Sequence, residues 1–175
     1  LNFPRELRNY LCLKKFFELQ QQKKIISLNF SNILIHKHKM SQPFVFDEKT
    51  EAAVVGDDDA DTVIVTYGRV TKNAYEAFNE LKVTHKIKLI KLVRIYPYDT
   101  DFILSHLKNA KTLFILEEGI KSGGIAEKIS SSICDKFCGK VIIRAVDNEF
   151  AFHATVDELY DYFGMSSNAI VDELK

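Results

Sequence analysis

The sequence predicts an α/β fold: a three-layer α/β/α arrangement around a mostly parallel open sheet of about five strands, preceded by a basic helical N-terminal segment. Two observations support this prediction. From residue 61 onward, short apolar runs alternate with segments of helical periodicity, as in a parallel sheet covered by helices on both faces. The clearest unit is 112–124, TLFILEEGIKSGG, where an apolar strand ends in two glutamates and turns on glycines into a helix.

The charges divide the 175 residues into unlike parts. The chain has 24 Lys and Arg and 24 Asp and Glu, so its net charge is zero. Residues 1–40 hold eight Lys or Arg against two Glu, which leaves +6 there and −6 in the rest. We therefore expect a basic segment over residues 1–45, an acidic linker over 46–60 and an α/β domain over 61–175.

Composition argues against several classes of protein. The hydrophobic fraction of 46% and charged fraction of 27% are ordinary for a globular protein. No apolar run approaches the roughly 18 residues of a membrane helix, and the start lacks the layout of a signal peptide. Three cysteines are too few and too irregular for a disulfide framework or a zinc site. We expect a cytoplasmic protein that binds neither membrane nor nucleic acid and holds no metal.

The N-terminal segment carries three expectations. Residues 2–22 have the cap and the wide apolar face of a helix. Residues 25–36 favour one or two short strands. The basic run 36–39, HKHK, could bind phosphate or metal, but a solvated loop is the preferred interpretation.

Four apolar runs have the length of strands. They are residues 62–67, 86–93, a run that starts at Thr112, and 139–146. In 86–93 lysines are interspersed with isoleucine and leucine, so we expect this strand to expose a lysine-rich face.

Five segments are predicted to be helical from their periodicity or caps. They are residues 70–81, a helix capped by Asp99 or Thr100 that runs to Leu107, 124–136, 155–163 with a capping box, and one from Ser166 or Ser167 to Lys175.

The glutamates at the end of the 112–124 strand are the first candidate site. In an open parallel sheet, ligands and neighbouring domains meet the chain at the carboxyl ends of strands. Neighbouring strand residues point to opposite faces, so Glu117 and Glu118 are not expected to share one site. We expect one to anchor the loop of Gly119, Gly123 and Gly124, and the other to be exposed or to face another domain.

Four motifs in this order carry a resemblance to a known family. They are TYGR (66–69), LVRIYPYD (92–99), LEEGIKSGGIAEKI (116–129) and DNEFAFHATVDELYDYFGM (147–165). Over residues 61–175 the chain resembles the C-terminal domain of 1-deoxy-D-xylulose-5-phosphate synthases, in the transketolase family. The EEG and GG pair also occurs in transketolases and in 2-oxoacid dehydrogenase β subunits, whereas the final motif is more particular to the synthases.

The resemblance implies a role within a larger enzyme. The parent enzymes are transferases of isoprenoid (terpenoid) biosynthesis, which join pyruvate to glyceraldehyde 3-phosphate with thiamine diphosphate and Mg²⁺. Those cofactors are held by a separate domain with a GDG motif, and Gly56-Asp57-Asp58 lacks its second glycine. The resemblance therefore implies no catalytic residue and no cofactor bound by this chain. Its implied partners are the remaining domains or subunits, a second copy in a homodimer, and a sugar-phosphate substrate.

Two residues receive roles only through the resemblance. Arg94 is the candidate for the substrate phosphate, although it lies three residues before Pro97 instead of four and Tyr96 replaces a lysine. The alternative is a surface arginine at a strand end. His153 matches the motif histidine, with Ala154 in place of a glycine, and packing or helix capping is the alternative role.

Two further interpretations concern binding and packing. The chain could be a stand-alone α/β module whose 119–124 loop holds a small anion at a helix N-terminus. We rank this below the enzyme-domain hypotheses. Cys134 and Cys138 lie one helical turn apart, and we expect them to pack as apolar side chains.

Overall fold

A computed structural model describes residues 52–149 and 153–175. They contain one five-stranded sheet in the order β1-β3-β2-β4-β5. The strands are β1 (Ala52–Gly56), β2 (Thr62–Thr66), β3 (Ile87–Leu92), β4 (Thr112–Ile120) and β5 (Lys140–Val146). Strands β2 to β5 are parallel, and β1 runs antiparallel to β3 at the edge.

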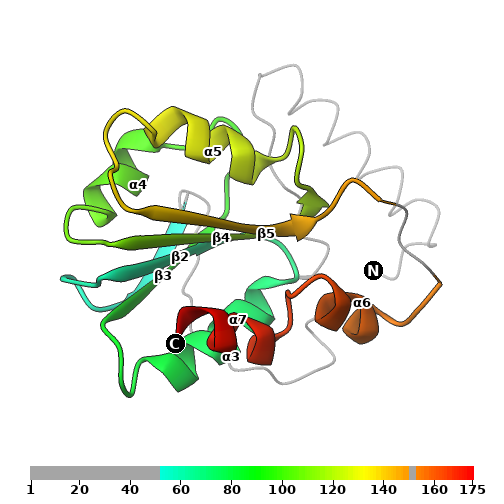
Figure 1. The fold of residues 1–175 in the computed structure, drawn as a ribbon. Helices are drawn as coiled ribbons and strands as arrows, with labels where there is room; N and C mark the ends of the chain where they lie inside the picture. The colour runs from blue at the N-terminus through cyan, green and yellow to red at the C-terminus, as the bar shows by residue number, and fades with distance from the viewer. Residues whose placement is uncertain (1–51, 150–152) are drawn as a thin grey trace, which may run out of the picture.

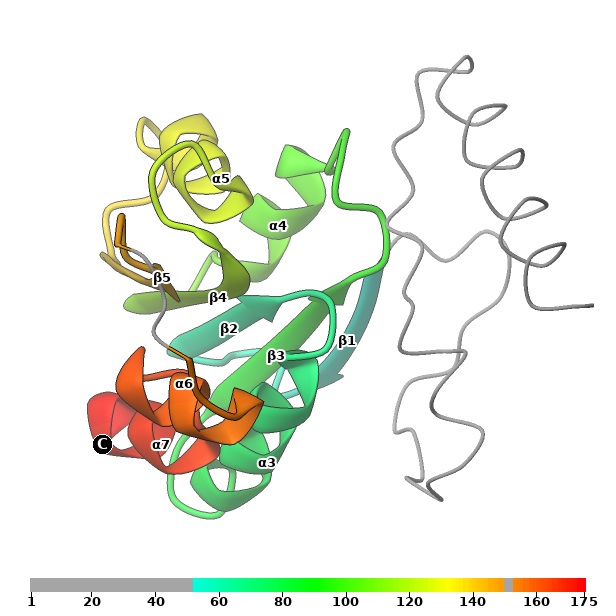
Figure 2. The same ribbon diagram turned by 90° about the vertical axis from the view of Figure 1, so that its right-hand side faces the viewer.

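Helices cover both faces of the sheet, as Figures 1 and 2 show. They are α3 (Thr71–Leu81), α4 (Thr100–His106), α5 (Ile125–Ile133), α6 (Val156–Tyr162) and α7 (Ser167–Leu174). Helices α4 and α5 lie on one face, and α3, α6 and α7 lie on the other (Figure 2). The predicted three-layer α/β/α fold with a mostly parallel five-stranded sheet is confirmed.

The core consists of two apolar layers that follow from strand alternation. Ile64 and Phe114 are fully buried towards α3 and α7. Val65 and Ile115, their neighbours in the same strands, are buried towards α4 and α5. Because both faces of the central strands are covered, these strands are nearly continuous apolar runs.

Side-chain caps fix where two of the helices begin. Asp99 is the N-cap of α4, and its carboxylate accepts a hydrogen bond of 2.8 Å from the backbone N–H of Phe102. Thr155 and Glu158 form the predicted capping box of α6. Helix α5 ends at Ile133, three residues before the predicted end.

Strand β1 corrects the expected extent of the linker. Residues 52–56 fall within the 46–60 segment, yet they pair with β3, with Ala52 opposite Leu92 and Gly56 opposite Lys88. Gly56 has a φ of +112°, and a Cβ there would overlap the carbonyl oxygen of Ile87. This short run has no strong local signal of a strand, because its partner strand lies about 35 residues further along the chain.

Strand β3 corrects the expected lysine-rich surface. Lys88 and Lys91 are three residues apart, so they point to opposite faces of the sheet, and both are buried. The Lys88 ammonium donates a hydrogen bond of 3.2 Å to the carbonyl oxygen of Asp58. Burial lowers the pKa of Lys91. This strand has no solvated lysine face, because β1 covers its outer edge and helices cover both its sides (Figure 2).

The expectations for residues 2–22, 25–36 and 36–39 lie outside the described residues. Within residues 52–149 and 153–175, no helix has the length and apolar character needed to cross a membrane.

Candidate functional site

The carboxyl ends of β2 and β4 form the point where the sheet changes its direction of winding. From β2 the chain passes through α3 to β3 on one side, and from β3 it passes through α4 to β4 on the other. Thr66 and Leu116 are neighbours in the parallel ladder, so the segments after them emerge side by side. Such a switch point is where open α/β sheets commonly bind ligands or other domains.

Glu117 joins this edge of the sheet to α5. Its side chain is completely buried, and its Oε2 accepts hydrogen bonds of 3.0 Å from the Tyr67 hydroxyl and the Ala126 backbone N–H. Burial, followed by the nearby Glu117 carboxylate, raises the pKa of Tyr67. This tyrosine therefore remains a hydrogen-bond donor at neutral pH.

The second carboxylate oxygen of Glu117 points at the glycine loop. Within the described part of the chain, this Oε1 has no hydrogen-bond partner. A Cβ on Gly124 would overlap it, and one on Gly119 would lie 3.3 Å away. The loop can approach the carboxylate this closely because position 124 is glycine.

Glu118 faces the opposite side of the sheet and binds α6. Its Oε1 accepts hydrogen bonds of 2.8 Å from the Arg69 guanidinium and 2.6 Å from the Tyr160 hydroxyl. The Arg69 Nε also lies 3.2 Å from that hydroxyl. Burial, with the Glu118 hydrogen bond as the next cause, raises the pKa of Tyr160 to about 12.

The glycine loop is held by the protein's own acidic groups. The Glu127 carboxylate accepts a hydrogen bond from the backbone N–H of Gly123, and Lys121 lies 3.6 Å from Asp147. Glu117 likewise accepts from the Ala126 N–H, so two carboxylates already bind backbone N–H groups at or just before the start of α5. These negative charges oppose an anion in the loop, which argues against the stand-alone anion-binding module.

Arg94 and His153 lie apart from this network. Arg94 is half-buried just after β3, and β2 separates β3 from β4, so Arg94 is on the same edge of the sheet as Glu117 but not beside it. His153 is exposed before the start of α6. The two residues do not belong to one cluster with Glu117 and Glu118.

The cysteines differ from expectation. Cys134 and Cys138 are both exposed, whereas α5 buries Ala126, Ile129 and Ile133. The prediction that the cysteines pack as apolar side chains is wrong, because the helix ends just before them and its apolar face is made by other residues.

Sequence reasoning missed Tyr67, Arg69 and Tyr160 as members of the site. Tyr67 and Arg69 belong to the TYGR motif, which begins with the last residue of β2. The motif was a usable signal, because β2 ends beside β4. Tyr160 gave no comparable signal, since its partner Glu118 lies 42 residues earlier in the chain.

The described residues do not fit a thiamine diphosphate and Mg²⁺ site. Among residues 52–149 and 153–175, no three His, Cys, Asp or Glu side chains lie close enough together to hold a metal ion. The two adjacent glutamates point to opposite faces and are already bonded to protein groups. No chemical step through those cofactors is assigned to these residues.

Comparisons with known proteins agree with this fold. The family model described as "Transketolase, C-terminal domain" matches residues 51–170. The 1-deoxy-D-xylulose-5-phosphate synthase of Clostridium tetani is 26% identical over 113 residues, covering 63% of this chain and 18% of the relative. That of Campylobacter hominis is 25% identical over 117 residues, covering 66% and 19%.

A solved structure extends the comparison to the fold. A split-gene transketolase, described as an inactive β4 tetramer, superimposes with a TM-score of 0.63 and 18% identity, covering 75% of this chain and 42% of the other. The chain spans less than a fifth of the length of the synthases it matches. The family match covers more than half of this chain, so the chain belongs to the transketolase C-terminal domain family.

Proposed function

We propose that this chain supplies the C-terminal domain of a 1-deoxy-D-xylulose-5-phosphate synthase-like enzyme. In such an enzyme, pyruvate and glyceraldehyde 3-phosphate give 1-deoxy-D-xylulose 5-phosphate. The observation that carries the proposal is that the transketolase C-terminal family and relatives named as this synthase match the same part of the chain. Thiamine diphosphate and Mg²⁺ would be held by other domains or subunits, in a cytoplasmic assembly.

The proposed work of the domain is assembly. Among the described residues, five large hydrophobic side chains are exposed. Val83 follows α3, whereas the other four follow β3, end β4 or lie on α6 (Tyr96, Ile120, Val156 and Tyr162). Ile120 ends β4 with 59% of its surface exposed. Exposed apolar side chains such as these are suited to contact with another domain or with the second copy of a homodimer.

Arg94 is proposed to contribute to the acceptor's phosphate. A guanidinium can bind two phosphate oxygens at once, and Arg94 lies at the same edge of the sheet as the proposed contacts.

A second candidate is a subunit that completes a separate chain. The fold similarity to a split-gene transketolase favours it, because that enzyme is divided between chains. In this case too the chain would not be catalytic alone, and activity would need its partner subunit.

The test is synthase activity of the natural gene product, with pyruvate, glyceraldehyde 3-phosphate, thiamine diphosphate and Mg²⁺. We expect Arg94→Ala to raise the KM for glyceraldehyde 3-phosphate about tenfold or more and to leave the KM for pyruvate unchanged, because a charge-assisted hydrogen bond is lost. Arg69→Ala is the matched control at the same edge. Equal effects of both variants would overturn the phosphate role.

The two candidates separate in the same assay. Activity of the single gene product supports the synthase, whereas activity that appears only with a co-purified second chain supports the split form. Both candidate functions would be overturned if the gene product, with or without a second chain, neither catalysed the reaction nor bound thiamine diphosphate.

A further inference from the structure

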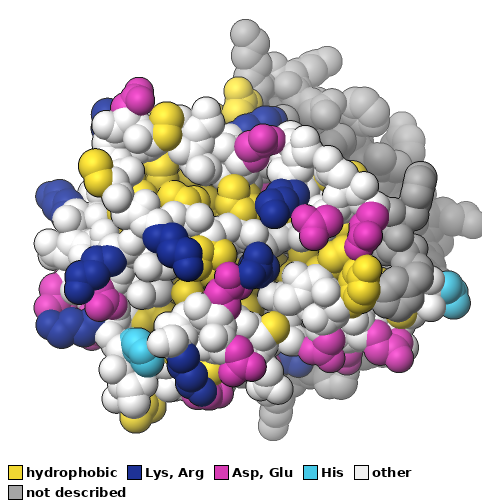
Figure 3. Space-filling model, viewed as in Figure 1, with side chains coloured by type: hydrophobic (Ala, Val, Ile, Leu, Met, Phe, Trp, Pro, Cys, Tyr) yellow, Lys and Arg dark blue, Asp and Glu magenta, His cyan; other side chains and the backbone are white. Residues whose placement is uncertain are grey.

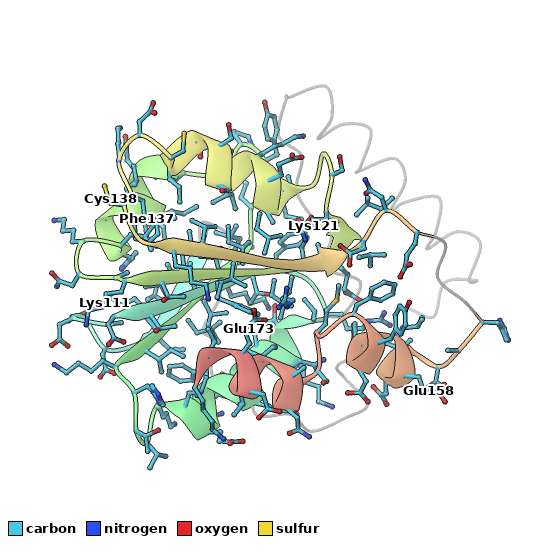
Figure 4. All side chains as sticks on the ribbon, in the orientation of Figure 1. Lys111, Lys121, Phe137, Cys138, Glu158 and Glu173 are labelled. Atoms are coloured by element: carbon cyan, nitrogen blue, oxygen red, sulfur yellow. The ribbon has the colours of Figure 1, made fainter. Side chains whose placement is uncertain are left out.

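A pocket of about 670 Å³ lies at the amino ends of β4 and β5, the edge of the sheet opposite the glycine loop. The end of α4, the loop before β4 and the loop between α5 and β5 form its walls. Figure 4 shows Lys111, Phe137 and Cys138 together at this end of the molecule, far from Lys121. Its volume falls in the range of pockets that hold small organic ligands.

Positive charge distinguishes the pocket from the rest of the domain. Four lysines line it (Lys108, Lys111, Lys136 and Lys140), and no Asp, Glu or His is part of the lining. The described residues as a whole hold 15 Lys and Arg against 19 Asp and Glu. Figure 3 shows several basic side chains at this left-hand edge of the molecule, with acidic side chains among them.

These charges have little compensation. Lys136 lies 4.0 Å from Asp101, whose side chain is 92% exposed, so solvent screens that pair. No ion pair joins Lys108, Lys111 or Lys140 to another side chain within residues 52–149 and 153–175.

Helix ends explain only half of the lysines. Lys108 and Lys136 follow the C-termini of α4 and α5, where a positive charge complements the helix dipole. Lys111 and Lys140 stand instead at the starts of neighbouring strands, and the Lys140 backbone N–H donates to the Lys111 carbonyl oxygen at 2.8 Å. The four lysines bring positive charge to the lining of one pocket, and a bound anion would offset the repulsion among them.

The floor of the pocket is apolar and already formed. Leu107 is buried, Leu104 and Phe137 are half-buried, and all three belong to the core layer under α4 and α5. A Cβ on Gly139 would lie 2.6 Å from the Lys111 carbonyl oxygen and would overlap the Phe137 ring. The glycine therefore lets the ring and the two strand starts pack closely.

We propose that this pocket binds an organic polyanion of nucleotide size, a di- or triphosphate attached to an aromatic or apolar group. The lysines would pair with the phosphate oxygens, and Phe137 with the leucines would contact the apolar part. The proposal does not depend on the proposed function, because the pocket lies at the opposite edge of the sheet.

The first test titrates ATP and inorganic tripolyphosphate separately into the full chain by calorimetry. We expect saturable binding with one site per chain, tighter for ATP because only ATP carries an aromatic group. The double variant Lys111→Ala with Lys140→Ala should weaken ATP binding about tenfold or more. The matched control, Lys82→Ala with Lys128→Ala, removes two lysines outside the pocket and should bind as the parent does.

The second test uses the cysteines as an internal comparison. Cys138 lines the pocket and Cys134 does not, although both are exposed. Saturating ATP should slow iodoacetamide alkylation of Cys138 several-fold and leave Cys134 unaffected, as measured by peptide mass spectrometry. Protection should disappear in the Lys111 and Lys140 double variant.

Three results would overturn the proposal. They are an absence of ATP binding at millimolar concentration, an equal loss of affinity in the control variant, and equal alkylation rates of Cys138 with and without ATP. If tripolyphosphate bound as tightly as ATP, the proposed contact with an aromatic or apolar group would be overturned. The pocket would then be a site for phosphate groups alone.

Discussion

The Glu117 carboxylate accepts a hydrogen bond of 3.0 Å from the backbone N–H of Ala126, so one buried side chain joins the end of β4 to the first turn of α5. The same oxygen accepts from Tyr67, which follows β2. A single acidic group therefore fixes the relative positions of two strands and a helix. It also fills a position that an external anion would otherwise take at this helix start.

Replacing Glu117 should show how much this link contributes to stability. Glu117→Ala removes the acceptor of the half-buried Tyr67 hydroxyl and of the buried Ala126 N–H, and an unpaired buried group costs about 1–3 kcal/mol. We expect the free energy of unfolding in urea to fall by about 3 kcal/mol. Glu117→Gln keeps an acceptor oxygen of the same shape and should lose about 1 kcal/mol or less.

Glu118 provides the comparison for this measurement. Its side chain is 32% exposed, so water can replace part of its interactions. Glu118→Ala should therefore cost clearly less than Glu117→Ala. Equal losses would contradict the structural difference between the two neighbouring carboxylates.

Tyr160 should make stability depend on pH in the alkaline range. A tyrosine in an unfolded chain ionises near pH 10, whereas the fold raises the pKa of Tyr160 to about 12. Between these values the unfolded state loses the proton and the folded state keeps it. The contribution is therefore fully present below pH 10, and the free energy of unfolding falls as the pH rises towards 12.

The measurement compares urea unfolding of the parent and Tyr160→Phe from pH 9 to pH 11. The variant lacks the titrating hydroxyl and should lose stability less steeply above pH 10. Tyr96→Phe removes a hydroxyl at a position that is 49% exposed and serves as the control. Identical slopes in all three proteins would refute the role of the Tyr160 hydroxyl.

The sequence was sufficient for the elements whose signals are local. The strand at 62–67, the helix at 155–163 with its capping box, and the 112–124 unit were all predicted because periodicity and caps act within a few residues. The family's fold followed from the same segments.

The sequence was insufficient wherever partners lie far apart in the chain. Strand β1 depends on β3, the burial of Lys88 depends on helix α4, and the Glu118 network depends on Tyr160 in α6. A run of alternating lysine and isoleucine has the same sequence pattern whether helices cover both faces of its strand or leave one face in solvent. The packing of helices against the sheet determines whether such lysines are buried or exposed.

Ile170 should report on how α7 closes the face of the sheet. It is fully buried in the layer that also holds Phe114 and α3. Ile170→Ala removes buried methyl groups and leaves a cavity, so we expect the free energy of unfolding to fall by about 2–4 kcal/mol. Val83→Ala, at a position 79% exposed, should change it by no more than about 0.5 kcal/mol.

Two glycines with positive φ should respond very differently to alanine. Gly56 and Gly123 have φ values of +112° and +78°, so both substitutions introduce backbone strain of about 1 kcal/mol or more. A Cβ on Gly123 would have no atom within 4 Å, whereas one on Gly56 would overlap the Ile87 carbonyl and lie 2.9 Å from the Lys88 Cα. Backbone atoms of a paired strand cannot move aside as a surface side chain can.

Gly56→Ala should therefore lower the free energy of unfolding by at least about 2 kcal/mol more than Gly123→Ala. Urea unfolding measures both losses, and amide hydrogen exchange at Leu89 and Lys91, whose N–H groups face β1, shows whether the pairing of β1 with β3 opens. Loss of protection only in Gly56→Ala is expected, because that substitution forces the edge strand away from its neighbour. Equal losses of stability without any change in protection would mean that β1 does not pack against β3 as closely as the register of Gly56 and Lys88 requires.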